Sequence, residues 1–189
     1  TIVKRGVTEL VTPGVSYNDK VLENKSNNFL AGLFLDDKRC GVSFLDVSTG
    51  DFFVAEGSAE YVDKLFQSFR PSEVVYAKNR KSQYTGLFGN DYFNYALEDW
   101  VFTSEFGNDL LLKHFETNSL KGFGIEAMQQ GIVAAGAALH YLNETAHDKV
   151  KHITTISRIE EDNYVWLDKF TIRNLELFSS ANENAKTLI

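Results

Sequence analysis

The sequence predicts an α/β domain built on a mixed β-sheet, with the element order β-β-β-α-β-α-β-α-α and part of a second, helical domain after it. Three observations predict this fold class. Three apolar runs in the first third of the chain are joined by short polar turns. A helical pattern then separates them from a fourth, β-branched run, and a long stretch rich in alanine and glycine follows with helical spacing.

The first element is a short strand in the segment RGVTELVTPGV, where Val7, Glu9 and Val11 alternate. Pro13 and Gly14 follow directly, and this pair is a strong turn signal. We therefore expect a strand that ends in a turn.

The next elements are three strands, expected at Phe29–Leu35, Cys40–Val47 and Phe52–Ala55. The sequences DDKR and STGD connect them. Connections this short join antiparallel neighbours, because parallel strands need a crossover of a dozen or more residues. These runs predict an antiparallel meander.

A helix and a parallel strand follow the meander. Ser58 can cap a helix, which Pro71 ends. The apolar residues of this helix share one stripe; they are Val62, Leu65, Phe66 and Phe69. The run Glu73–Ala77 comes next, and a helical crossover makes it parallel to one of the earlier strands.

The remaining elements are a short helix near 81–88, a strand near 93–97 and helices at 102–115 and 127–146. In the last helix, apolar residues recur at spacings of four and three, and Gly131 and Gly136 allow close approach to a neighbour. We expect it to pack on the sheet. The complete order is the topology of the ribonuclease-H-like fold.

The composition changes after Thr145, where the polar segment AHDKVKH reads as a linker. We predict a first domain at 1–148 and the truncated start of a second at 149–189. The tail is too short to form an independent core, although it is rich in apolar residues. The pattern indicates a piece of a longer protein.

Charge and composition narrow the functional classes. The chain has 189 residues, a net charge of −7 and a pI near 5.1, which disfavours direct binding of duplex DNA.

Cys40 is the single cysteine, so no internal disulfide forms and a reducing compartment is expected. The first residues do not resemble a signal peptide. The stretch 127–146 contains several polar residues and is no membrane span, so we expect a cytoplasmic protein.

Asp46, in LDVSTGDFFV, is the first candidate for chemistry, because it stands in an apolar strand just before a turn. A two-metal nuclease on this fold needs carboxylates from the first strand, the first helix and the end of the fourth strand. The first strand, FLAGLFL, has no acid, and the fourth ends in Tyr76 and Ala77. One glycine in the turn, Gly50, also gives few free N–H groups for a phosphate. The sequence favours a turn-capping Asp46.

Three other motifs are weak signals. His140, Glu144 and His147 share one helix face and could bind zinc, but the HExxH spacing is absent and a solvated helix end is favoured. Cys40 has no histidine nearby in sequence and is expected to be a small buried hydrophobe. The glycine-containing KGFGIE (121–126) follows no strand and predicts a turn into the long helix.

Four motifs then show a resemblance: VTELVTPGV (7–15), LDVSTGDF (45–52), GFGIE (122–126) and LDKFTIRNLEL (167–177). Their order and spacing resemble the bacterial MutS family of DNA mismatch repair proteins, over nearly the whole chain. The likeness is to the connector domain, which in that family has a ribonuclease-H-like fold, followed by the start of the helical core or lever domain. The mismatch-reading domain, the clamp and the P-loop ATPase of the family have no counterpart here. One departure is Val15, where the family usually has threonine.

The resemblance implies a structural role for the motif residues, with no catalytic, cofactor-binding or metal-binding residue. These residues are Thr12, Pro13, Gly14, Asp46, Ser48, Gly50, Gly122, Phe123, Gly124, Asp168, Arg173, Asn174 and Glu176. In the last motif, Asp168 can cap a helix from which Arg173 and Glu176 reach neighbouring elements.

The resemblance further implies a noncatalytic connector that relays between the mismatch-binding and ATPase domains and docks the partner protein MutL. Its partners would be MutL, sibling MutS domains and the second subunit of a MutS dimer, with DNA bound only through the full-length protein and no membrane. ATP and Mg would bind elsewhere in that protein, and no cofactor is expected in this segment. The alternative is a metal-dependent nuclease or phosphotransferase that uses Asp46 with Asp51 or Glu60.

Overall fold

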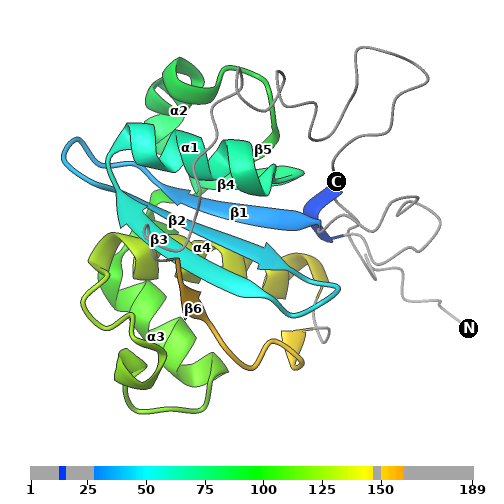
Figure 1. Ribbon diagram of the computed structural model, residues 1–189, viewed down its shortest axis with the longest axis vertical. Helices are drawn as coiled ribbons and strands as arrows, with labels where there is room; N and C mark the ends of the chain where they lie inside the picture. The colour runs from blue at the N-terminus through cyan, green and yellow to red at the C-terminus, as the bar shows by residue number, and fades with distance from the viewer. Residues whose placement is uncertain (1–12, 16–27, 147–149, 160–189) are drawn as a thin grey trace, which may run out of the picture. The chain divides into compact units, whose positions relative to one another are not determined.

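The centre of the fold is a six-stranded mixed sheet with the order β5-β4-β1-β2-β3-β6 (Figure 1). The computed structural model describes residues 13–15, 28–146 and 150–159. Its strands are β1 (Phe29–Phe34), β2 (Cys40–Asp46), β3 (Phe52–Gly57), β4 (Glu73–Ala77), β5 (Phe93–Leu97) and β6 (Ser157–Arg158). Its α-helices are α1 (Ala59–Phe69), α2 (Lys81–Phe88), α3 (Ser104–His114) and α4 (Gln129–Ala146). Short 3-10 helices are η1 (Pro13–Val15), η2 (Lys78–Arg80), η3 (Asp99–Phe102) and η4 (Leu120–Phe123).

The antiparallel meander and the parallel fourth strand are as predicted, and the structure adds the pairing of β5. β1, β2 and β3 form the antiparallel meander, β4 runs parallel to β1, and β5 runs parallel to β4. The fold class predicted from the sequence is therefore confirmed, a mixed ribonuclease-H-like sheet with helices on both faces. The predicted strand at 7–11 and the tail from 160 onward lie outside the described residues.

One strand was missed from the sequence. β6 is only two residues long and pairs in parallel with β3, and the Ile159 N–H donates to the Val54 carbonyl at 2.8 Å. Ile153, Ile156 and Ile159 are all buried. The sheet and core thus continue past residue 148, and the point at which a second domain begins stays a prediction.

Helices cover both faces of the sheet, α1 and α2 on one and α3 and α4 on the other (Figure 1). The Ser58 side chain caps α1 by accepting from the Tyr61 N–H, as expected, and Arg70 ends it in the left-handed conformation. The α1 face is aromatic: the rings of Phe44 and Phe69 stack at 4.3 Å. None of the helices in the described parts of the chain is long and apolar enough to cross a membrane.

α4 lies unusually close to the sheet because small residues separate the two. A Cβ at Gly32 or Gly41 would overlap the α4 backbone, and the Ser43 hydroxyl donates to the Ala134 carbonyl at 3.1 Å. On its other side, Gly136 meets Gly107 of α3. The predicted packing of this helix on the sheet is confirmed.

Two predicted helix starts need correction. The helix expected from residue 102 begins at Ser104, because η3 occupies the preceding residues and the Thr103 hydroxyl caps the helix by accepting from the Phe106 N–H. The helix expected from residue 127 begins at Gln129.

Candidate functional site

The carboxylate of Asp46 lies at the end of β2 and is fully buried. Oδ1 accepts from the Ser48 N–H at 2.8 Å and from its hydroxyl at 2.6 Å. The Thr49 N–H lies 3.4 Å from the same oxygen. The turn is closed by the Gly50 N–H, which donates to the Asp46 carbonyl at 2.9 Å, and Gly50 has φ 82°. Asp46 shapes the hairpin, as the sequence favoured.

Asn28 ties this turn to the segment by which the chain enters the domain. Its backbone N–H donates to Asp46 Oδ2 at 2.9 Å, and its side-chain amide donates to the Pro13 carbonyl at 2.7 Å. Its Oδ1 accepts from the Ser72 hydroxyl. The Pro-Gly motif and the Asp46 motif, which the sequence showed only as separate features, therefore meet through one asparagine.

Glu73 is a second buried carboxylate, on the other side of β1 from Asp46. It begins β4 and is fully buried. Oε2 accepts from the Gly14 N–H at 3.0 Å, and Oε1 accepts from the Tyr141 hydroxyl of α4 at 2.6 Å. A Cβ at Gly14 would lie 2.9 Å from that of Glu73, so the close approach requires glycine. The entering segment is thereby bound to both β4 and α4.

The segment between α4 and β6 is bound to the same hairpin. His152 Nε2 lies 2.6 Å from the Val47 carbonyl, which can only accept, so this nitrogen carries the proton. A Cβ at Gly50 would lie 3.2 Å from the His152 ring. His114 at the end of α3 holds the adjacent Ile153 carbonyl at 2.8 Å. Burial lowers the pKa of His114, and that hydrogen bond offsets part of the effect.

We call this set the hairpin junction: Asn28, Asp46, Val47, Glu73 and His152. Asp46 holds the entering segment through Asn28, and its neighbour Val47 holds the segment before β6 through His152. Both carboxylates already accept hydrogen bonds from the protein, which suits them to fixing positions. The contacts of the hairpin junction therefore hold parts of the chain in fixed positions.

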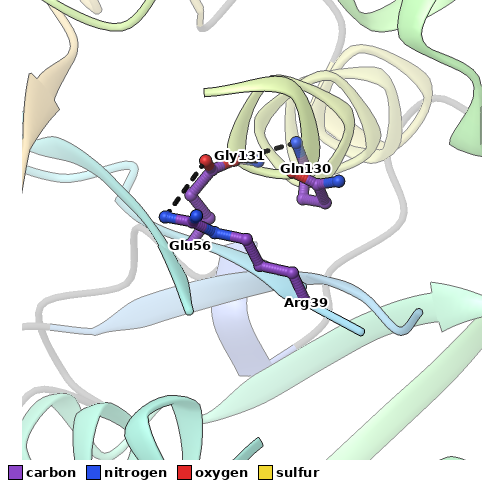
Figure 2. A network of polar contacts seen from close by, with 4 residues as sticks. All are labelled: Arg39, Glu56, Gln130 and Gly131. Carbon is purple, nitrogen blue, oxygen red and sulfur yellow. Dashed lines mark hydrogen bonds and ion pairs between the residues drawn. The ribbon is translucent and has the colours of Figure 1, made fainter. Parts of the chain in front are cut away.

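A third acidic residue, Glu56 at the end of β3, caps the long helix. Figure 2 shows its side chain directed at the first turn of α4, with Arg39 beside it. Oε2 accepts from the N–H groups of Gln130 at 3.0 Å and Gly131 at 3.2 Å, while Arg39 lies 3.4 Å from Oε1. A carboxylate at a helix N-terminus satisfies unpaired N–H groups and complements the helix dipole. Glu56 thus occupies the place where an external anion would bind.

The possible zinc face is only partly described. His140 Nε2 lies 3.6 Å from Glu144 Oε1, and His147 is outside the described residues. The solvated setting expected for His140 is wrong: its side chain is 16% exposed, and its ring packs against Trp100 and Phe106. Over 13–15, 28–146 and 150–159, no three His, Cys, Asp or Glu side chains are grouped so as to hold a metal ion.

The other two acids named for the nuclease alternative, Asp51 and Glu60, each accept a hydrogen bond from a residue two positions away in sequence. Asp51 is exposed and accepts from the Thr49 hydroxyl at 2.8 Å. Glu60 is exposed near the start of α1, where a hydrogen bond from Ser58 lowers its pKa.

The other sequence candidates are structural. Cys40 is buried, and burial raises the pKa of its thiol. Gly124, with φ 71°, ends η4 and turns the chain towards α4, while Phe123 packs on Phe115 at 4.8 Å. Gly122 is exposed with open space around it. Thr12 and the motif residues Asp168, Arg173, Asn174 and Glu176 lie outside the described residues.

Sequence reasoning missed Asn28, Glu56, Glu73 and His152. Their contacts join residues far apart in the chain, so no local motif marks them. Glu73 alone gave a signal, because it is the one charged residue in the apolar run EVVYA. A lone acid in a strand buried along its whole length requires partners.

Comparison with known proteins agrees with this architecture. Residues 28–154 match the family model described as MutS domain II. A DNA mismatch repair protein MutS from Flavobacterium johnsoniae is 60% identical over 189 residues, which is 100% of this chain and 22% of that protein. The proteins of the same name from Cytophaga hutchinsonii and Bacteroides fragilis are 58% and 53% identical over 188 residues, again 22% of each. The chain thus spans about a fifth of the length of these relatives.

Proposed function

The chain belongs to the MutS family, and because its residues 28–154 correspond to domain II, we propose that it works as the connector of a mismatch repair ATPase. In this role it transmits displacements between the mismatch-binding and ATPase domains of the parent protein, and it docks MutL. It performs no chemistry of its own. The parent protein binds DNA and ATP through its other parts, in the cytoplasm.

The hairpin junction is the observation that supports the relay. A relay needs both of its ends fixed to one rigid body, so that a displacement at one end reaches the other. Here Asp46 and Val47 are consecutive residues at the end of a central strand, and they hold the entering segment and the segment that leads through β6 to residue 159. The entering segment is fixed a second time by Glu73, and the segment before β6 a second time by His114.

The hydrogen bonds that Asp46 accepts support a scaffolding role for this residue rather than a role in a nuclease site. A catalytic carboxylate must offer free lone pairs to a metal ion. The buried carboxylate of Asp46 instead accepts from Ser48 and Asn28. Metal binding there would require these hydrogen bonds to break.

The test uses the full-length parent protein with Asn28→Ala combined with Tyr141→Phe, which removes the Asn28 amide bond to Pro13 and the hydroxyl bond to Glu73. We expect basal ATPase activity and mismatch affinity to remain, while the stimulation of nucleotide exchange by mismatched DNA and the ATP-dependent recruitment of MutL fall. Glu126→Ala, at an exposed position, is the matched control. Unchanged coupling in the double variant would contradict the relay.

A separate assay addresses the alternative enzyme. The fragment is incubated with Mg²⁺ or Mn²⁺ and labelled DNA or RNA–DNA hybrid. Cleavage by the wild type that disappears in Asp46→Ala would replace the connector proposal with a nuclease.

A further inference from the structure

The outer edge of β5, which pairs with no other strand among the described residues, carries exposed aromatic side chains. β5 is the last strand on its side of the sheet within the described residues. Phe93 is 55% exposed, Tyr95 is 50% exposed and Trp100, in η3, is 56% exposed. We call Phe93, Tyr95 and Trp100 the aromatic edge.

Two residues of the aromatic edge, Tyr95 and Trp100, pack against α4. The Tyr95 ring lies 5.4 Å from that of Tyr141, and the Trp100 ring lies 5.4 Å from that of His140. His140 and Tyr141 are consecutive residues of α4, so both exposed rings rest against one point of the helix. Rigid aromatic residues that are anchored on one side and exposed on the other are typical of binding surfaces.

The edge also carries a concentrated negative charge. The acidic residues of 91–112 are Asp91, Glu98, Asp99, Glu105 and Asp109, and this segment has no Lys, Arg or His. It therefore has a formal charge of −5, in a chain whose net charge is −7. Asp91 and Glu98 flank β5 at its two ends and are exposed, and Glu98 pairs with Lys78 at 3.1 Å. Such a field attracts basic partners and repels acidic ones.

We propose that the aromatic edge docks an extended, basic and apolar segment of a partner protein, which adds to the sheet as a strand beside β5. Backbone groups of the partner pair with the open edge, its apolar side chains cover Phe93 and Tyr95, and its Lys or Arg side chains face Asp91 and Glu98. The inference deepens the proposed docking function and rests on it for one point, that MutL is the protein that presents this segment.

The chemistry of the site is tested with two synthetic peptides, one alternating lysine with valine and one alternating glutamate with valine. Each is titrated into the isotope-labelled 189-residue chain by NMR. We expect the lysine peptide to shift amide signals of β5, with an affinity that falls as salt is added, and the glutamate peptide to bind at least tenfold more weakly, roughly one decade as expected for opposed charges.

Two variants identify the surface. Phe93→Ser with Tyr95→Ser should weaken the lysine peptide about tenfold. Asp91→Lys with Glu98→Lys leaves the apolar residues intact and should invert the peptide preference. Leu87→Ser on α2 is the matched control, because Leu87 is also exposed, at 42%, but lies on another element. Equal binding of both peptides, no binding, or shifts confined to other strands would overturn the inference.

The same variants in the full-length parent protein separate the two proposals. If the wild type recruits MutL and the Phe93 and Tyr95 variant recruits it equally well, the edge inference is wrong and connector docking stands. If the wild type recruits no MutL while the lysine peptide binds β5, MutL docking is wrong and the edge is a site for another protein.

Discussion

The backbone N–H of Asn28 donates to the buried carboxylate of Asp46 at 2.9 Å, across 18 positions of sequence. The same asparagine holds the Pro13 carbonyl with its side chain. Asp46 therefore does two tasks: it closes the β2–β3 turn and it positions the residue that receives the entering chain. Removing the carboxylate is therefore expected to weaken both the turn and the position of Asn28.

Asp46→Ala is expected to lower the free energy of unfolding by about 3 kcal/mol, because the N–H groups of Asn28 and Ser48 lose the buried carboxylate that accepts from them. Urea unfolding followed by circular dichroism measures the change. Asp51→Ala, in the same turn but exposed, should cost less than about 1 kcal/mol. Similar losses in the two variants would contradict the role given to Asp46.

Glu56→Ala is expected to cost about 2 kcal/mol, because the N–H groups of Gln130 and Gly131 lose their acceptor at the positive end of α4. Arg39→Ala removes only the partly exposed ion pair and should change stability by less than about 1 kcal/mol. Thermal unfolding of both variants decides between cap and ion pair, since an equal loss would mean that the pair with Arg39 matters most.

Gly41→Ala is expected to destabilise the domain by several kcal/mol, roughly the upper range for a single substitution, because the added methyl group overlaps the backbone of α4 at Gln130. Gly86→Ala in α2 has open space around it and should stabilise by up to about 1 kcal/mol through helix propensity. Denaturant midpoints measured side by side test the pair. A mild effect at position 41 would show that α4 can move away from the sheet.

Stability should fall as the solution becomes more acidic than the ordinary histidine pKa of 6.5, from which burial lowers that of His114. The unfolded chain takes up a proton there before the folded one, so the contribution of neutral His114 is present above that pKa. It is lost as the pH drops through the lowered value. Unfolding free energies measured between pH 7.5 and 5, for wild type and His114→Gln, should show a shallower slope in the variant. Parallel slopes would assign the acid sensitivity to other groups.

Tyr84→Phe is expected to leave stability unchanged or raise it by about 1 kcal/mol. The Tyr84 hydroxyl is buried with no hydrogen-bond partner among the described residues, and its ring stacks on Tyr76 at 4.2 Å. Burial, with nearby Tyr76, raises the pKa of Tyr84 to about 12. Removing an unsatisfied hydroxyl while keeping the ring eliminates a desolvation cost. A clear loss of stability on unfolding would reveal a partner for this hydroxyl.

Local patterns in the sequence were enough to predict most of the fold. β4, α2 and β5 have the predicted bounds, and α1 lies between Ser58 and Pro71 as predicted. Apolar spacing, helix caps and prolines act over a few residues, so a single sequence reveals them. β6 was missed because two residues give no periodicity, and their pairing depends on β3.

The candidate site was predicted only where its contacts are local. The hydrogen bonds from Ser48 to Asp46 span two positions and follow from turn chemistry. The contact between Tyr141 and Glu73 spans 68 positions, and that between His152 and Val47 spans 105. Such contacts depend on the tertiary arrangement, and no periodicity or motif in one sequence encodes them.

The glycines beneath α4 restrict how this domain can respond to force. Most helices rest on a sheet through a layer of long side chains, whose rotamer changes permit small sliding movements. At Gly32 and Gly41 that layer is missing, and backbone meets backbone. Sliding of α4 along the sheet would bring the two main chains into overlap, so we expect the helix and the sheet to move together as one rigid body.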